Sequence, residues 1–247
     1  ARRLERFAGH AERVGLPVVF ANQVGANDDL IFDGNSLAVG ADGSVLAALP
    51  AFEEATATVD PFDADPLGDS PNKTTPDRAT EAREAISLGI ADYFRKTGFS
   101  EAIVGLSGGI DSSVAAALAV DALGAENVYG LSLPSTVTSE ESVTDARELA
   151  ANLGIEFDVV PIGAATEELE RAIEEGAGTR VGGIAAENTQ ARLRGDVLMA
   201  VANARDGLVL TPDNKSEAAV GYCTLYGDTV GALAPLGDCY KTLVYGI

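Results

Sequence analysis

The chain of 247 residues has few of the side chains from which many catalytic and structural centres are built. It contains no tryptophan, one methionine, one histidine and two cysteines. Cys223 and Cys239 do not make a disulfide framework, and neither a Cys-x-x-Cys pair nor a histidine cluster indicates zinc. His10 lies on a predicted helix face, and the sequence has no serine-elbow motif, so we expect a surface histidine and no Ser-His-Asp centre.

Positive charge is also scarce. Seventeen lysines and arginines face 38 aspartates and glutamates, which gives a net charge of −21, and only four of the cations are lysines. A negative field of this size argues against nucleic acid or an anionic membrane as a partner. Many carboxylates with few lysines favour a surface that stays hydrated in high salt, and an ordinary acidic protein is the alternative.

Long apolar segments are missing as well. No run approaches the roughly 18 residues of a membrane-spanning helix, and no basic segment precedes a short apolar one as in a signal peptide. We therefore expect a cytoplasmic protein. Hydrophobic residues make up 46% of the chain, which is enough for a sizeable core. The chain begins at Ala1, already inside an amphipathic pattern, and from this we expect a fragment of a longer protein.

Residues 1–50 predict a small unit of mixed structure. Apolar residues at helical spacing indicate a helix over 1–14. Strands are expected at 16–20, 37–39 and 45–47, the last two joined by an Asp-Gly turn. One helix end and about four strands are too little to close a core alone.

The composition changes after residue 50. Residues 51–76 carry recurrent prolines among Asp, Thr, Ser and Gly, which predicts a linker. From residue 77 onward, helical and strand patterns alternate. Helices are expected at 77–97, 112–123, 140–153, 164–174 and 185–204, and strands at 102–106, 128–133, 156–160 and 208–210. This alternation, with continuously apolar strands, predicts an α/β fold whose parallel sheet has helices on both faces.

Segment 105–113 carries most of the chemistry, because it follows a buried strand and begins a helix at the edge where such sheets bind ligands. Its glycines let backbone amides approach an anion, and its serines add hydroxyl donors beside the positive end of a helix starting near Ser112. These residues are Ser107, Gly108, Gly109, Ser112 and Ser113. The spacing matches neither a Walker A loop nor Gly-x-Gly-x-x-Gly.

Asp111 lies in the same loop. Its carboxylate would repel a phosphate unless a cation lies between them, so the loop predicts Mg²⁺ beside a bound phosphate. A glycine-rich strand-to-helix turn without any ligand is the alternative interpretation.

Ser107–Ser112 resembles the pyrophosphate loop of the N-type ATP pyrophosphatases, which have an adenine nucleotide alpha hydrolase-like fold. Four further blocks resemble NAD synthetases among them: Asn188–Arg194, Asn214–Glu217, Gly221–Asp228, and Ala234–Asp238 before Lys241. In addition, Leu16–Gly25 and Asp29–Ser36 resemble the end of a nitrilase-like glutaminase domain, which precedes the synthetase in glutamine-dependent NAD synthetases. The resemblance implies a C-terminal glutaminase remnant over 1–50, a linker over 51–76, and a synthetase domain over 77–247 with its C-terminal part incomplete.

The resemblance implies that ATP adenylates deamido-NAD⁺, releasing pyrophosphate, and that ammonia then displaces AMP to give NAD⁺, the ammonia coming from glutamine in the full enzyme. It implies Mg²⁺ as a cofactor on Asp111 and Glu217, and a homo-oligomer. It assigns deamido-NAD⁺ to Asn188, Arg192, Glu217 and Tyr222. It assigns ATP to Gly105, Leu106, Ser107, Gly108, Gly109, Ile110, Asp111, Ser112, Thr211, Pro212 and Lys241. No side chain is identified as nucleophile or base.

The sequence departs from the family pattern in three places. Pro212 stands where relatives have a threonine that contacts ATP, so either Thr211 substitutes for it or ATP loses a contact. The segment 134–139 lacks the aromatic residue usual there. No cysteine precedes Cys223, so we do not expect this chain to hydrolyse glutamine.

Two other functions stay open on these grounds. One is a different amide-forming N-type ATP pyrophosphatase, which would accept another substrate such as XMP or aspartate. The other is a non-catalytic nucleotide-binding subunit.

Overall fold

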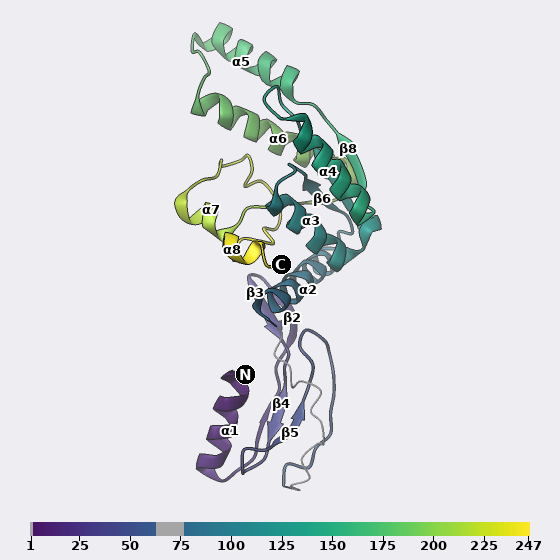
Figure 1. The fold of residues 1–247 in the computed structure, drawn as a ribbon, viewed down its shortest axis with the longest axis vertical. Helices are drawn as coiled ribbons and strands as arrows, with labels where there is room; N and C mark the ends of the chain where they lie inside the picture. The colour runs from purple at the N-terminus through teal and green to yellow at the C-terminus, as the bar shows by residue number, and fades with distance from the viewer. Residues whose placement is uncertain (1, 63–76) are drawn as a thin grey trace. The chain divides into compact units, whose positions relative to one another are not determined.

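The computed structural model describes residues 2–62 and 77–247 and divides the chain into two compact units, Ala1–Asp92 and Tyr93–Ile247 (Figure 1). The boundary between the units lies inside helix α2 (Arg78–Thr97). Part of the predicted linker, residues 63–76, lies outside the described residues. The domain limits 1–50, 51–76 and 77–247 stay a prediction.

The first unit contains a three-stranded antiparallel sheet with one helix packed on it. The strands are β1 (Val18–Phe20), β4 (Leu37–Val39) and β5 (Val45–Ala48), in the order β1-β4-β5. Helix α1 (Arg2–Val14) places Phe7 against Phe20, with ring centroids 4.9 Å apart, over a buried cluster of Ala11, Leu37 and Val39. The predicted first helix, first strand and Asp-Gly hairpin are confirmed.

A second hairpin was not located from the sequence. Strands β2 (Val24–Asn27) and β3 (Leu30–Asp33) pair antiparallel around a two-residue turn in which Asp28 has φ 53°. The described part of residues 1–50 therefore holds five strands where four were expected. Within the same unit, the Ala26 amide donates to Oδ2 of Asp92 on α2 at 2.8 Å, which fixes the hairpin against that helix.

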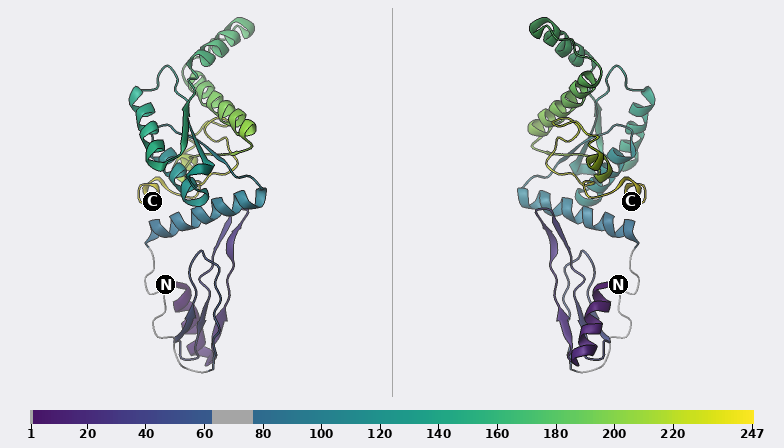
Figure 2. Two further views of the ribbon diagram at one scale, coloured as in Figure 1. Left: turned by 90° about the vertical axis from the view of Figure 1, so that its right-hand side faces the viewer. Right: turned by 90° about the vertical axis from the view of Figure 1, so that its left-hand side faces the viewer.

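The second unit is built around a parallel sheet, which confirms the predicted fold class. Its strands are β6 (Ala102–Gly105), β7 (Val128–Ser132), β8 (Glu156–Val159) and β9 (Leu208–Leu210), in the order β8-β7-β6-β9. Helices α3 (Ile110–Leu123) and α4 (Glu140–Leu153) pack on one face and α6 (Ile184–Arg205) on the other (Figure 2). Helix α5 (Gly163–Ala177) packs on α6. Strand β1 belongs to a separate sheet, as predicted.

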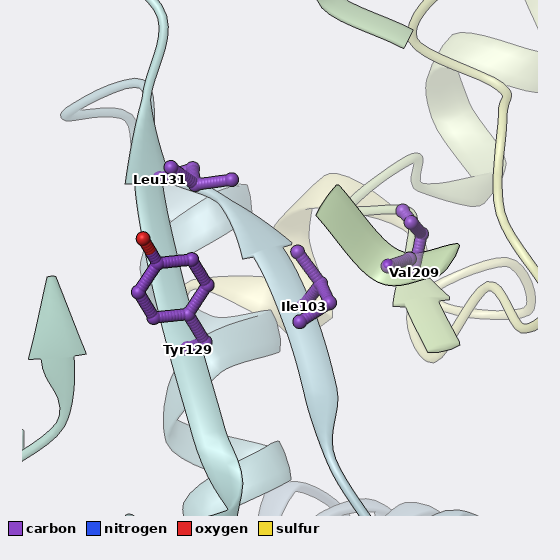
Figure 3. Close-up of a cluster of buried hydrophobic side chains, with 5 residues drawn as sticks. Ile103, Tyr129, Leu131 and Val209 are labelled. Carbon is purple, nitrogen blue, oxygen red and sulfur yellow. The ribbon is translucent and has the colours of Figure 1, made fainter. Parts of the chain in front are cut away.

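The core under α6 is made by side chains from neighbouring strands. Ile103, Tyr129, Leu131 and Val209 lie together on one face of the sheet (Figure 3) and pack against Ala202 of α6. Burial and a 2.7 Å hydrogen bond to Asp158 raise the pKa of Tyr129 to about 12, so this phenol stays neutral. Because helices cover both faces of the sheet, the strands are continuous hydrophobic segments in the sequence.

An ion-pair cluster stabilises the amino-terminal edge of the sheet. Arg205 donates through Nε and Nη2 to Glu101 at 2.8 and 2.7 Å, and through Nη2 to Glu156 at 2.7 Å. Its guanidinium also lies 4.0 Å from the centroid of the Tyr129 ring. These paired groups lie at the edge opposite to the carboxyl ends of the strands.

The sheet has a topological switch at β6. From β6 the chain moves to β7 and β8 on one side, and it later returns to β9 on the other side. Open α/β sheets bind ligands in the crevice outside the carboxyl ends of strands at such a point. Among the described helices, none combines the length and apolarity of a membrane span.

Candidate functional site

A cavity of about 410 Å³ lies at the carboxyl ends of β6, β7 and β9, where the switch predicts it. Segments after all three strands, α6, and the region around α7 (Lys215–Val220) contribute to its wall. Nine of the residues assigned from the resemblance line it: Gly105, Leu106, Ser107, Asp111, Ser112, Thr211, Pro212, Glu217 and Tyr222. The structure therefore brings most of the sequence-predicted site into one place.

The loop between β6 and α3 approaches α4 so closely that glycine is required. Gly108 has φ 79°, and a Cβ there would lie 2.7 Å from the Ser142 carbonyl oxygen. Both the backbone conformation and the space exclude a larger residue. The loop is thus shaped by α4 as well as by its own sequence.

The serines of the loop bind one another and the backbone. Ser112, buried, donates to the Gly109 carbonyl at 3.0 Å, and its Oγ lies 3.1 Å from that of Ser107. The hydroxyl of Ser113 donates to the same Gly109 carbonyl at 2.9 Å. These bonds hold the loop in a fixed shape before any ligand arrives. That these serines also bind a phosphate stays a prediction.

Helix α3 begins at Ile110, two residues before the predicted start. The residue before it is Gly109, which has no side chain to cap the first amides. An uncapped helix N-terminus concentrates N–H donors and positive potential at one point. Gly108 and Ile110 therefore present backbone amides at this end of the loop, while the amide of Gly109 donates to Ser107 Oγ at 3.2 Å.

Asn214 connects the two carboxylates predicted to hold Mg²⁺. Its side chain is fully buried and donates through Nδ2 to Asp111 Oδ1 at 3.1 Å. The side-chain Oδ1 of Asn214 accepts from the backbone amides of Ser216 and Glu217 at the start of α7. The backbone amide of Asn214 donates to Glu217 Oε2 at 3.2 Å. The bonds between Asn214 and Glu217 form a capping box at the start of α7, and the bond to Asp111 joins α7 to α3.

Lys241, at the start of α8 (Lys241–Val244), forms an ion pair with Asp111. Burial alone would lower the pKa of Lys241, but the hydrogen bond and the charge of Asp111 outweigh it and raise the pKa. The Lys241 amide donates to Ser216 Oγ at 3.0 Å, which places α8 against α7. Lys241 is thus brought to the loop although 130 positions separate it from Asp111.

The donor set of this region fits Mg²⁺. The ion is bound in nucleotide sites by one or two carboxylates together with phosphate oxygens and water. Asp111 and Glu217 supply two carboxylates on the wall of one cavity, and Asn214 donates to both, through its side chain to Asp111 and through its backbone amide to Glu217. No group of three or more ligating side chains is found among the described residues.

Thr211 and Pro212 follow β9 at the cavity wall. The Thr211 hydroxyl donates to the carbonyl oxygen of Asp228 at 2.7 Å, and its amide donates to the Leu233 carbonyl at 3.0 Å. Thr211 therefore joins two segments of the wall. Whether it also contacts ATP in place of the missing threonine stays a prediction.

The residues assigned to the dinucleotide are only partly cavity residues: Glu217 and Tyr222 line the cavity, whereas Asn188 and Arg192 of α6 are not among the lining residues. Tyr222 lines the cavity and is 78% exposed. Asn188 accepts from the Thr224 hydroxyl at 2.8 Å, and Arg192 donates through Nε to the Leu225 carbonyl at 3.2 Å. Both α6 residues thus contact the loop that follows α7.

Arg194, Asp213 and Asp228 line the cavity but were not assigned from the sequence. Nη1 of Arg194 is buried and has no hydrogen-bond partner among the described residues. Burial lowers the pKa of Arg194, and the nearby charge of Asp228 opposes this effect. Arg194 stands in the same sequence block as Asn188 and Arg192. The sequence therefore indicates the block, but not that the Arg194 side chain lines the cavity.

Asp213 is the most perturbed carboxyl group of the cavity. Burial, together with the charges of Asp228, Glu217 and Asp111, raises its pKa to about 6. Its ionised form therefore destabilises the folded chain above pH 6, whereas below the unfolded pKa both states are protonated and the cost disappears.

We expect Asp213→Asn to stabilise the protein against urea at pH 7.5, with a gain that declines as pH falls from 6 toward 4. Asp145→Asn, on the exposed face of α4, is the control and should show no such pH-dependent gain. Urea unfolding at several pH values measures both variants. A pH-independent effect of Asp213→Asn would contradict the assigned pKa.

Two known protein families match this chain. A sequence model of NAD synthase matches residues 82–247, more than half of the chain, and one of carbon-nitrogen hydrolase matches residues 8–66. The chain belongs to the NAD synthase family. Every cavity residue described above lies within the matched region of that family.

Relatives of the NAD synthase family match both units. The glutamine-dependent NAD(+) synthetase of Synechocystis is 46% identical over 237 residues, covering 95% of this chain and 42% of the relative. The structure of the Acinetobacter baumannii glutamine-dependent NAD+ synthetase with ADP is 37% identical, with TM-score 0.91 over 99% of this chain and 47% of that one. The Campylobacter jejuni NH3-dependent NAD synthetase is 30% identical, with TM-score 0.63 over 69% of this chain and 72% of that one. The chain spans less than half the length of the two glutamine-dependent relatives.

Proposed function

We propose that the protein catalyses ATP-dependent amidation of deamido-NAD⁺ to NAD⁺, with release of AMP and pyrophosphate. The observation that carries the proposal is the cavity in which the Ser107–Ser112 loop, Asp111 and Glu217 meet, in a chain of the NAD synthase family. The relative from Acinetobacter baumannii, whose structure contains ADP, supports an adenine nucleotide as one substrate.

The first step activates the carboxylate of deamido-NAD⁺. One carboxylate oxygen bonds to the α-phosphorus of ATP, the bond from that phosphorus to the bridging oxygen breaks, and pyrophosphate leaves. The amides of the loop and the N-terminus of α3 bind the departing phosphates, and Lys241 supplies a positive charge beside them. Mg²⁺ held by Asp111 and Glu217 would offset the negative charge of the phosphates.

In the second step, ammonia displaces AMP from the acyl adenylate. The lone pair of ammonia attacks the acyl carbon, the bond to the adenylate oxygen breaks, and the nitrogen loses a proton to give the amide of NAD⁺. A carboxylate is a poor electrophile, and the adenylate gives it a good leaving group. The buried Arg194 Nη1, which lacks an acceptor among the described residues, supports an anionic ligand in the cavity.

Glutamine as the nitrogen source belongs to the proposal. It is supported by the carbon-nitrogen hydrolase match over residues 8–66 and by the names of the relatives. Deamido-NAD⁺ and ATP are the other proposed partners, and a homo-oligomer and a cytoplasmic location stay predictions.

Substrate selection tests the proposal. The protein is incubated with ATP, Mg²⁺ and ammonium chloride, and AMP formation is measured with deamido-NAD⁺, XMP or aspartate as acceptor. We expect AMP and an equal amount of NAD⁺ with deamido-NAD⁺ alone. Turnover of XMP or aspartate instead would show that the enzyme is a different amide-forming ATP pyrophosphatase, and ATP binding without any turnover would show a non-catalytic subunit.

A further inference from the structure

The second half of the loop Gly221–Asp228 is attached to α6. A Cβ on Gly195 would lie 3.0 Å from the Gly227 carbonyl oxygen, and one on Gly227 would lie 2.9 Å from the carbonyl carbon of Ala191. Arg192 adds its hydrogen bond to the Leu225 carbonyl. Two glycines facing each other thus let the loop backbone lie directly on the helix.

Thr224 is the residue at which the internal bonds of this loop converge. Its amide donates to Asp228 Oδ1 at 2.6 Å, and its carbonyl accepts from the Gly227 amide at 2.9 Å and from the Thr229 hydroxyl at 3.2 Å. The backbone bonds close the loop, while the hydroxyl of Thr224 is used elsewhere.

The Thr224 hydroxyl donates to Oδ1 of Asn188 on α6 at 2.8 Å. Because an amide side chain has its acceptor and its donors on opposite sides, this bond fixes the rotation of the Asn188 amide. The Nδ2 group is then turned away from Thr224 as a donor for an acceptor atom of another molecule. Carbonyl, carboxylate and hydroxyl oxygens of a dinucleotide are such acceptors.

We propose that Thr224 is a positioning residue for the dinucleotide substrate, acting by orienting the Asn188 amide. The inference rests on the proposed function, since it assumes that Asn188 binds deamido-NAD⁺. It adds that a loop hydroxyl, outside the cavity wall, sets the affinity for the dinucleotide without affecting ATP.

Steady-state kinetics of Thr224→Val tests this role, because valine has nearly the shape of threonine and keeps the backbone amide bonded to Asp228. We expect the KM for deamido-NAD⁺ to rise about 3- to 10-fold, the effect of one partly buried hydrogen bond. The KM for ATP should change less than about twofold. Thr224→Ser restores the hydroxyl and should restore the KM. Thr229→Val removes a hydroxyl just after the loop, which bonds the Thr224 backbone and not Asn188, and is the matched control, with little expected change.

A double-mutant cycle separates positioning from a general effect on the loop. If Thr224 acts through Asn188, then Thr224→Val combined with Asn188→Ala should be no worse than Asn188→Ala alone. Additive losses, an equal rise of both KM values, or an unchanged KM for deamido-NAD⁺ in Thr224→Val would overturn the inference. A wild-type protein that forms no AMP with deamido-NAD⁺ would instead overturn the proposed function, and this inference with it.

Discussion

Asp111→Asn should abolish turnover while leaving the fold intact. The substitution removes the carboxylate proposed to hold Mg²⁺ and the charge that pairs with Lys241, but an amide can still bond to Asn214. Since an amide is a far weaker Mg²⁺ ligand than a carboxylate, we expect at least a 100-fold loss of kcat at saturating ATP. NAD⁺ formation measures the loss, and thermal unfolding checks the fold. Glu217→Gln should act in the same direction with a smaller loss, because Glu217 is also assigned to the dinucleotide.

Asp121→Asn is the matched control for this prediction, since Asp121 is an exposed aspartate further along the same helix, α3. Its turnover should equal that of the unchanged protein. An Asp111→Asn protein that keeps half of its activity at saturating Mg²⁺ would show that Asp111 does not hold the metal.

This chain should make NAD⁺ from ammonia and not from glutamine. Its two cysteines, Cys223 and Cys239, both lie in the part matched by the NAD synthase family, and the residues matched by the carbon-nitrogen hydrolase model contain none. No thiol of the hydrolase segment is therefore available to attack the glutamine amide. We expect at least a 100-fold preference for ammonium chloride over glutamine at equal concentration.

The rate with ammonium chloride should also rise with pH. Only NH₃ carries the lone pair that attacks the acyl adenylate, and its share grows about tenfold per pH unit while NH₄⁺ predominates. As a control, adding a separate glutaminase should make glutamine an effective nitrogen source. Turnover with glutamine alone, in a preparation free of glutaminase, would contradict the prediction.

The parallel sheet could be predicted because its strands are continuously apolar and alternate with long helices, as in Ala102–Gly105 followed by α3. The hairpin β2–β3 was missed because its strands have only four residues each and its Asp28-Asp29 turn lacks the Asn-Gly or Asp-Gly signal. Helices α7 and α8, of six and four residues, are too short to show helical periodicity.

The sequence predicts those parts of the site that depend on neighbouring residues. The Ser107–Ser112 loop is visible because its function depends on adjacent backbone amides and a following helix. The ion pair between Asp111 and Lys241 depends on how α8 packs, and no periodicity reports a contact across 130 positions. For the same reason, the contacts of Thr224 with α6 and the burial of Asp213 become apparent only in the fold.

Exchange of labelled pyrophosphate into ATP tests the central claim most directly, because it reports adenylation without the ammonia step. With Mg²⁺ and no nitrogen source, the protein should catalyse exchange when deamido-NAD⁺ is present and none when NAD⁺, which lacks the free carboxylate, replaces it. Exchange that does not require deamido-NAD⁺, or its absence in a protein that binds both substrates, would contradict the account.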